Sequence, residues 1–303
     1  MQNDLKEYIK KLLDSLTPIA PIPTGVSPRY RKDGKIRAIL FDIYGTMLIS
    51  SSGDIDQAEM TDKNLKSALD AAGIIISDGT QNVLDHILMD FEYTVKVCHE
   101  SARRSNVPYP EIDILSIWKI VLIHARRKGL IRFQDTADIM LMTCVFEFLS
   151  NKVYPMPGLK ETLSRLHEVC IPLGIVSNAQ FYTPVLMNYY LNDMVNLNEK
   201  IRGFDQELTV FSYKFGKGKP DLSLFEELTH ALKWKYGIIP SETLLVGNDM
   251  IKDIYASKQV GFKTALFAGD KRSLRMHKGD ERTSGLEPDF VITELKQILE
   301  IVL

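Results

Sequence analysis

The fold of this chain is decided by residues 37–46, which read RAILFDIYGT. The apolar run Ala38–Phe41 predicts a buried strand, and the carboxylate of Asp42 follows it at once. Asp42 would then lie at the C-terminal edge of a parallel sheet, where open α/β sheets bind their ligands. A carboxylate there can act as a nucleophile, and Gly45 lets the backbone turn tightly towards a small anion. Many strands end in Asp-x-x-Gly only to make a turn, so the functional interpretation depends on partners elsewhere in the chain.

The second half of the chain alternates between short apolar strands and helices. Strands are expected at residues 171–176, 207–213, 243–246, 263–267 and 290–292, and helices at 159–169, 222–236 and 249–259. This alternation predicts an α/β fold with a doubly wound parallel sheet, because right-handed crossovers need a helix between parallel neighbours.

A helical segment separates the first strand from the others. Helical patterns cover residues 63–72, 80–104, 113–128 and 135–149, with breaks at Gly73, Pro108, Pro110 and Gly129. The polar stretch Ser50–Asp56 and the segment Val153–Gly158 suit hinges. We therefore expect an α/β core formed by residues 36–52 and 153–303, with an all-helical domain, residues 53–152, inserted in it.

Residues 1–35 form a third part. Apolar side chains recur at helical spacing from Leu5 to Leu16, and Pro18, Pro21 and Pro23 then predict an extended linker as far as Lys35. The helix could be a docking arm, but we favour packing against the main body.

Composition narrows the classes of function. The chain has 303 residues, 45% hydrophobic and 25% charged, as in a soluble globular protein. A net charge of −2 favours no nucleic-acid partner, and no apolar stretch reaches membrane-spanning length. Cys98, Cys144 and Cys170 are widely spaced, which suits reduced thiols in a cytoplasmic protein. No His-Glu-x-x-His motif is present, so a zinc site is not expected.

Polar side chains end three further strands or open the helices after them. Ser177 and Asn178 follow one strand and can hydrogen-bond an anionic oxygen. Lys219 precedes Pro220, which can start a helix, a suitable place to neutralise phosphate charge. Asp249 and Asp253 follow the strand that ends at Gly247, and they would share one face of a helix beginning near Asp249.

Each of these residues alone has a structural explanation, such as a turn, a helix cap or a solvated first turn. Their joint occurrence at successive strand ends favours a single site. With Asp42, the acidic pair would form an all-oxygen cluster that suits Mg²⁺ rather than zinc.

In these four motifs, residues 42–46, 177–178, 219–220 and 247–253, the chain resembles the haloacid dehalogenase-like (HAD) hydrolase superfamily from about Lys35 onwards. The resemblance implies a Rossmann-like HAD core, and residues 53–152 look like the superfamily's mobile cap. It also implies that Asp42 is the nucleophile, Ser177 the phosphate-binding hydroxyl and Lys219 the charge-neutralising lysine, with Lys214 and Lys217 as rivals. The implied Mg²⁺ ligands are Asp42, the Tyr44 carbonyl, Asp249 and Asp253, the last directly, through water, or as a support for Lys219. The implied substrate-binding residues are Ile43, Tyr44, Gly45, Thr46, Ser177 and Asn178.

One position departs from the phosphatases of the family. Tyr44 stands where they have an Asp that protonates the leaving alcohol, and such help is worth about 10²–10⁴-fold in rate. The Asp-x-Tyr-Gly-Thr pattern resembles 2-haloacid dehalogenases, whose leaving halide needs no proton. Those enzymes lack the paired metal-binding acids, and no arginine lies between Met60 and Val97 to hold a halide; Arg103 and Arg104 come later.

We therefore favour a Mg²⁺-dependent phosphatase acting on a small phosphorylated metabolite. A carbon–halogen hydrolase acting on a halogenated substrate is the alternative, and an inactive phosphate-binding protein is a third possibility. In the phosphatase, Tyr44 either donates a proton weakly, only packs, or is compensated by a good leaving group. Residues that could line the substrate pocket in the cap are Tyr93, His99, Arg103, Trp118 and His124.

Overall fold

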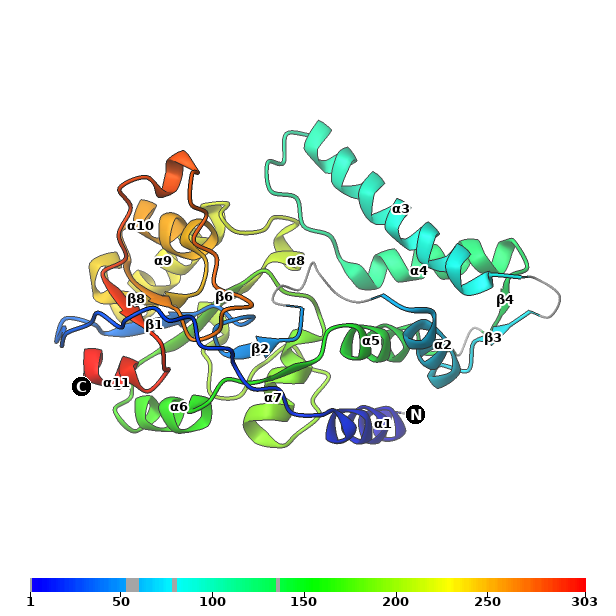
Figure 1. Cartoon of the computed structure of the whole chain (residues 1–303), viewed down its shortest axis with the longest axis horizontal. Coiled ribbons are helices and arrows are strands. Elements are labelled where there is room, and N and C mark those ends of the chain that lie inside the picture. The colour runs from blue at the N-terminus through cyan, green and yellow to red at the C-terminus, as the bar shows by residue number, and fades with distance from the viewer. Residues whose placement is uncertain (1, 53–59, 78–80, 135–136) are drawn as a thin grey trace.

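A six-stranded, entirely parallel sheet forms the centre of the molecule (Figure 1). The computed structural model describes residues 2–52, 60–77, 81–134 and 137–303. In spatial order the strands are β10 (Phe290–Ile292), β9 (Lys263–Phe267), β8 (Thr243–Gly247), β1 (Ala38–Phe41), β6 (Leu173–Ser177) and β7 (Thr209–Phe211). The predicted α/β fold with a doubly wound parallel sheet is confirmed.

Strand β1 lies in the middle and is buried on both faces. Leu40 packs in one hydrophobic cluster with helix α9 (Ser223–Tyr236), whereas Ile39 and Phe41 belong to another with helix α6 (Leu159–Glu168). Successive side chains of a strand point to opposite faces, so an unbroken apolar run is what a sheet covered on both sides requires. The remaining helices of this part are α7 (Thr183–Asn192), α8 (Ser212–Phe215), α10 (Ala256–Gln259), α11 (Gln297–Val302) and the short helices η2 (Gln206–Leu208), η3 (Pro240–Glu242), η4 (Met250–Tyr255) and η5 (Glu281–Thr283).

The register of the central strands aligns their C-terminal ends. Phe41 lies opposite Ile175 on one side and opposite Val246 on the other. The residues that follow these strands therefore emerge at the same edge of the sheet. This edge is where the polar motifs of the sequence meet.

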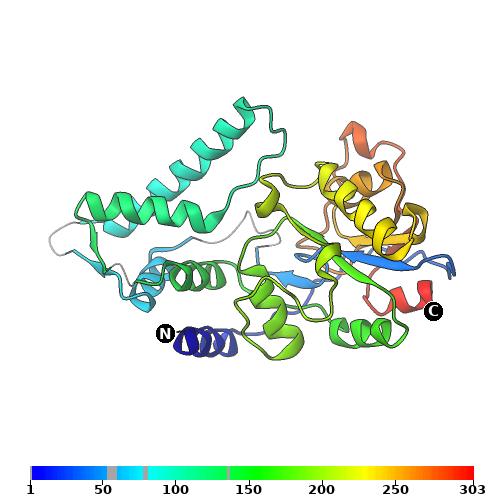
Figure 2. The same cartoon turned by 180° about the vertical axis from the view of Figure 1, so that it is seen from behind.

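Four helices, from the segment that was predicted to be helical, form a separate layer beside the sheet (Figures 1 and 2). These helices are α2 (Asp62–Ala71), α3 (Val83–Arg104), α4 (Ile114–Arg127) and α5 (Ile139–Ser150). At their centre the Trp118 ring stacks on Phe91 at 4.4 Å and meets Phe146 edge-on at 4.9 Å. This layer was expected to be all-helical, but it also contains a two-residue ladder formed by β3 (Ile75–Ile76) and β4 (Ile131–Arg132).

The two chain segments that join the helical layer to the sheet are paired with each other. Strand β2 (Leu48–Ser50) runs antiparallel to β5 (Val153–Pro155). One expected hinge, Val153–Gly158, therefore begins as a strand. The other, Ser50–Asp56, lies partly outside the described residues, as does the expected domain boundary at residues 52 and 53.

The N-terminal segment packs on the body of the protein. In helix α1 (Gln2–Ser15), Leu5, Ile9 and Leu13 are buried in the main hydrophobic cluster. The linker then follows the sheet, where Arg29 and Val291 exchange two backbone hydrogen bonds of 2.8 Å. The packing interpretation is confirmed over the docking arm. None of the helices in the described ranges is long and apolar enough to cross a membrane.

Candidate active site

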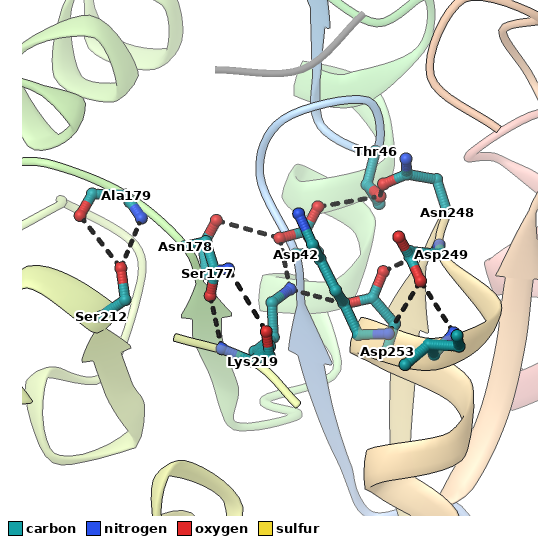
Figure 3. A network of polar contacts seen from close by, with 12 residues as sticks. Asp42, Thr46, Ser177, Asn178, Ala179, Ser212, Lys219, Asn248, Asp249 and Asp253 are labelled. Atoms are coloured by element: carbon teal, nitrogen blue, oxygen red, sulfur yellow. Dashed lines mark hydrogen bonds and ion pairs between the residues drawn. The ribbon is translucent and has the colours of Figure 1, made fainter. Parts of the chain in front are cut away.

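Asp42 is the residue on which the site converges (Figure 3). Its Oδ1 accepts hydrogen bonds from the Ser177 hydroxyl at 2.9 Å and from the Lys219 ammonium at 2.6 Å. Its Oδ2 has one contact among the described residues, a long one of 3.5 Å with the Thr46 hydroxyl. The structure thus brings together three residues that are far apart in the sequence and were expected to act together.

Lys219 is buried between two carboxylates. Its Nζ lies 2.6 Å from Asp42 Oδ1 and 2.5 Å from Asp253 Oδ1. Burial by itself would lower the pKa of this lysine, but the charges of Asp253 and Asp42 outweigh burial and raise it, so the side chain stays protonated. Burial in turn raises the pKa of the Asp253 carboxyl, despite the nearby ammonium.

The loop that carries Lys219 is held by Asn178. The Asn178 Oδ1 accepts a hydrogen bond of 2.7 Å from the Lys219 backbone N–H. Pro220 does not start the next helix as expected: the Lys219–Pro220 peptide is cis, and α9 begins only at Ser223. Of the rival lysines, Lys214 pairs with Glu199 and Lys217 lies 3.5 Å from Asp221, so Lys219 is the one that reaches Asp42.

The two acids after β8 do not lie on one face of a helix, which corrects the expectation. Asp249 has extended backbone angles, φ −119° and ψ 122°, and caps η4 by accepting N–H bonds from Ile251 and Lys252 at 2.7 and 2.8 Å. Its backbone N–H donates to Asp253 Oδ2 at 3.0 Å. Asp249 is thus the N-cap and not a residue of the helix, while the Asp253 carboxylate contacts Lys219.

Gly247 makes this arrangement possible. A Cβ built on Gly247 would lie 2.3 Å from Asp253 Cγ. A side chain at this position would therefore displace the carboxylate that holds Lys219. The glycine next to the acidic pair is explained by close approach rather than by a turn.

The other residues of the motif at residues 42–46 follow Asp42 in the chain. Thr46 donates to Asn248 Oδ1 at 3.0 Å, and Gly45 has a φ of +83° with no room for a Cβ, which would lie 2.5 Å from Ser273 Cβ. The Ile43 side chain is part of the hydrophobic core, so only its backbone could meet a substrate.

Tyr44 is buried, and its phenol is already bound. The Tyr44 and Thr183 hydroxyls lie 2.9 Å apart, and burial raises the pKa of the phenol well above its ordinary value. A phenol with a raised pKa is a poorer proton donor. Packing is therefore the better-supported of the roles expected for this side chain.

A segment after β9 that was not predicted to belong to the site closes it. His277 Nε2 lies 2.9 Å from both carboxylate oxygens of Asp249, and the backbone of Arg275 exchanges hydrogen bonds with Asn248 and Met250. No motif marks these residues. Only their proximity in the fold identifies them.

A small cavity of about 30 Å³, the space of about one water molecule, lies at the centre of the site. Asp42 and Asp249 both face it, and oxygen donors of this kind suit Mg²⁺. Within the described ranges, however, no group of three or more His, Cys, Asp or Glu side chains is arranged to hold a metal ion. Both Asp253 oxygens already accept hydrogen bonds, so support of Lys219 fits this residue better than direct ligation. The cavity is lined by Asp42, Tyr44, Asn178, Lys219, Asn248, Asp249, Lys252, Asp253, Ser273 and Arg275.

A second cavity, of about 460 Å³, lies between α3 and the segment that follows Ser177. His99 and Arg103, two of the expected pocket residues, line it. The others do not: Trp118 is fully buried in the helical layer, Tyr93 is 67% exposed, and His124 lies 3.7 Å from Asp90.

Known proteins resemble the chain in both sequence and fold. A glyceraldehyde 3-phosphate phosphatase of Pyrococcus furiosus is 27% identical over 147 residues, 48% of this chain and 54% of that protein. A phosphoglycolate phosphatase of Vibrio vulnificus is 32% identical over 153 residues, 48% of this chain and 56% of that protein. The chain thus spans about half the length of the curated relatives it matches.

Among solved structures, a 2-haloacid dehalogenase from Pseudomonas syringae pv. Tomato superimposes with a TM-score of 0.53 at 19% identity, covering 88% of this chain and 97% of that one. At that identity the likeness shows the fold alone. The model of the haloacid dehalogenase-like hydrolases matches residues 36–261, which include β1 and every motif of the site. This chain belongs to the haloacid dehalogenase-like hydrolase family.

Proposed function

We propose that this hydrolase cleaves phosphate monoesters of small metabolites, with Asp42 as the nucleophile and Mg²⁺ as the cofactor. The observation that carries the proposal is the shared Lys219 ammonium, 2.6 Å from Asp42 and 2.5 Å from Asp253. A buried cation beside a nucleophilic carboxylate can neutralise an incoming dianion. The phosphatase activities of the two curated relatives support the same reaction class.

The proposed reaction has two steps. A carboxylate oxygen of Asp42 attacks phosphorus, the bond from phosphorus to the alcohol oxygen breaks, and the alcohol part leaves as an anion that takes its proton from water. Water then attacks phosphorus of the aspartyl phosphate, which releases inorganic phosphate and regenerates the carboxylate. The Ser177 hydroxyl and the Lys219 ammonium, both on Asp42 Oδ1, are placed to bind phosphoryl oxygens.

The proposed Mg²⁺ would be held by Asp42, Asp249 and the Tyr44 carbonyl, where it would neutralise phosphate charge. Lys219 contacts Asp42 and Asp253 but forms no hydrogen bond with Asp249 among the described contacts, so the lysine would not compete with the ion for Asp249. His277 would have to yield an Asp249 oxygen to the ion.

The bound phenol of Tyr44 bears on the choice of substrate. With its hydroxyl held by Thr183, we favour substrates whose leaving group needs little protonation, such as acyl or aryl phosphates. We also propose that residues 36–52 and 153–303 form the catalytic core and that residues 53–152 form a cap that closes over it and excludes water.

Carbon–halogen hydrolysis is the second candidate. The bound Tyr44 phenol favours this reaction as well, because a halide leaves without being protonated and Tyr44 supplies no proton. Arg103, moreover, lines the large cavity.

Turnover assays would separate these functions. We expect hydrolysis of 4-nitrophenyl phosphate with Mg²⁺, loss of activity in EDTA, and recovery when Mg²⁺ is restored. Asp42→Asn should reduce the rate by at least about 10³-fold, because the nucleophile is removed. The matched control Asp70→Asn, an exposed acid paired with Lys66, should keep full activity.

Each alternative has its own outcome. Unchanged activity in EDTA would reject the metal. Halide release from 2-chloropropionate without metal would establish the dehalogenase instead. Absence of turnover combined with Mg²⁺-dependent binding of a phosphorylated ligand would indicate a binding protein.

A further inference from the structure

The large cavity begins next to residues of the candidate site. Ala179 and Gln180 line it, directly after Ser177 and Asn178, which contact Asp42 and the Lys219 loop. This adjacency makes the space the candidate for the alcohol part of a phosphate ester bound at Asp42. Its volume of about 460 Å³ is in the range of small-molecule sites, roughly 300–1,000 Å³.

One edge of the cavity is basic. Lys96, His99 and Arg103 line it from α3, and their i, i+3, i+7 spacing puts them on one helical face. Neither Lys96 nor Arg103 forms an ion pair within the part of the chain that is described. Arg104, one position further on, instead pairs with Glu100 at 4.0 Å.

Two of the acidic side chains that line the same cavity already accept hydrogen bonds from other residues. Glu111 accepts hydrogen bonds from Ser212 at 2.8 Å and from Gln180 at 3.3 Å, on the side of the sheet. Glu147 accepts one of 3.1 Å from Tyr182, and burial raises its pKa to about 7. Glu92 is exposed on α3 itself. Among the described lining residues, α3 thus contributes two cationic side chains, Lys96 and Arg103, against the single acid Glu92.

The wall beside this edge is apolar. Phe91 and Phe146 line it, with ring centres 6.4 Å apart, and the buried Trp118 ring packs against both. Ile112 and Ile114 continue the wall. A compound held here would lay an apolar surface on these side chains and reach the basic edge.

We propose that Lys96, His99 and Arg103 bind a second anionic group of the substrate. The preferred substrates are then phosphate monoesters whose alcohol part has an apolar body and carries a carboxylate or a second phosphate. This inference rests on the proposed phosphatase function, which places the reacting phosphate of the substrate at Asp42. The α3 edge would bind the second anionic group of the same substrate.

Matched aryl esters test the proposal. Phenyl phosphate, 4-carboxyphenyl phosphate and 1,4-phenylene bisphosphate differ in the second group alone, and the last two tell a carboxylate from a phosphate. We expect the wild type to favour at least one charged ester over phenyl phosphate by about tenfold in kcat/KM, through KM. Lys96→Gln or Arg103→Gln should each reduce that preference by about fivefold, and the double variant should abolish it.

The ratio of kcat/KM values for two esters is compared among the variants, so differences in the intrinsic reactivity of the esters cancel. Arg104→Gln, a neighbouring arginine that does not line the cavity, should keep the wild-type preference. Added salt should weaken the preference, as screening of partly exposed charges requires. An equal preference in the wild type and in the double variant would overturn the inference while the phosphatase function stands.

Binding of phenylphosphonate and 4-carboxyphenylphosphonate, measured by calorimetry, covers the case of no turnover. If no ester is hydrolysed but the carboxylate still tightens binding in the wild type and not in the double variant, the basic edge is established and the proposed function fails. Equal affinities for the two phosphonates in all variants would reject the basic edge independently of catalysis.

Discussion

At the scale of the single residue, the positive charge of Lys219 compensates the buried carboxylates of the site. It is almost fully buried, with 2% of its side chain exposed, and both of its carboxylate partners are buried as well. Ionised carboxylates in such a place are costly without a cation, because desolvation is not repaid. The same contacts therefore serve stability and the proposed chemistry.

Replacing Lys219 with Met should remove activity and destabilise the fold. We expect a loss of about 3–5 kcal/mol in the free energy of unfolding, the usual result of breaking a buried ion pair. Urea denaturation measures it. Lys217→Met is the control, because that side chain is partly exposed and its ion pair is worth less than about 1 kcal/mol.

A second substitution sharpens this prediction. Adding Asp253→Asn to Lys219→Met removes one of the unpaired charges and should restore part of the lost stability. If Lys219→Met were as stable as the wild type, the lysine would not be compensating these acids.

Helix α5 shows how an element can carry a titrating group into the interior. Its buried face packs in the main hydrophobic cluster, and Glu147 is the one acid within Ile139–Ser150. Burial raises the pKa of Glu147 to about 7, with the Tyr182 hydroxyl bond opposing the shift. The charged form is therefore disfavoured in the folded state.

This raised pKa predicts how stability depends on pH. The unfolded chain has a Glu pKa near 4.3, so the contribution of Glu147 is fully present below that value and is lost as pH rises through about 7. Between pH 5 and 8 the wild type should lose about 2.5 kcal/mol relative to Glu147→Gln, because the loss of 1.36 kcal/mol per pH unit ends near pH 7. Urea denaturation of both proteins at the two pH values tests this.

The exposed Glu92, on the same cavity, provides the comparison. Glu92→Gln should follow the wild type at both pH values. A difference between Glu147→Gln and the wild type that is the same at pH 5 and pH 8 would show that Glu147 does not titrate in this range.

At the scale of the whole molecule, residues 2–35 connect the helical layer to the sheet. Helix α1 packs against α5, while the linker after it reaches the far edge of the sheet at β10 (Figure 1). Thr24 adds a hydrogen bond of 2.7 Å to the Ala268 carbonyl, just after β9. The segment thus spans both parts of the molecule.

Truncating the buried face of α1 should destabilise the whole protein. Ile9 is fully buried, so Ile9→Ala is expected to cost about 2–5 kcal/mol of unfolding free energy. Lys10→Ala, on the exposed face, loses only an ion pair with Asp14 and should change it by less than about 1 kcal/mol. Equal stability of the two variants in urea would mean that α1 does not pack as described.

The repeating patterns of the sequence were sufficient for most elements. Ala38–Phe41, Lys263–Phe267 and Phe290–Ile292 form strands with the predicted bounds. The β2–β5 ladder was missed, because Leu48–Ser50 and Val153–Pro155 are only three residues long and pair across about 100 positions of sequence. Such pairing leaves no local pattern to recognise.

The sequence by itself determined the sheet, the helical segment and the gathering of Asp42, Ser177 and Lys219 at one edge, because apolar periodicity sets the strands and parallel strands end together. The tertiary structure alone decided which way Asp249 and Asp253 point, that His277 meets Asp249, and that the Tyr44 hydroxyl is bound to Thr183. These contacts depend on side-chain directions and on loops far apart in the chain, and no local sequence pattern encodes them.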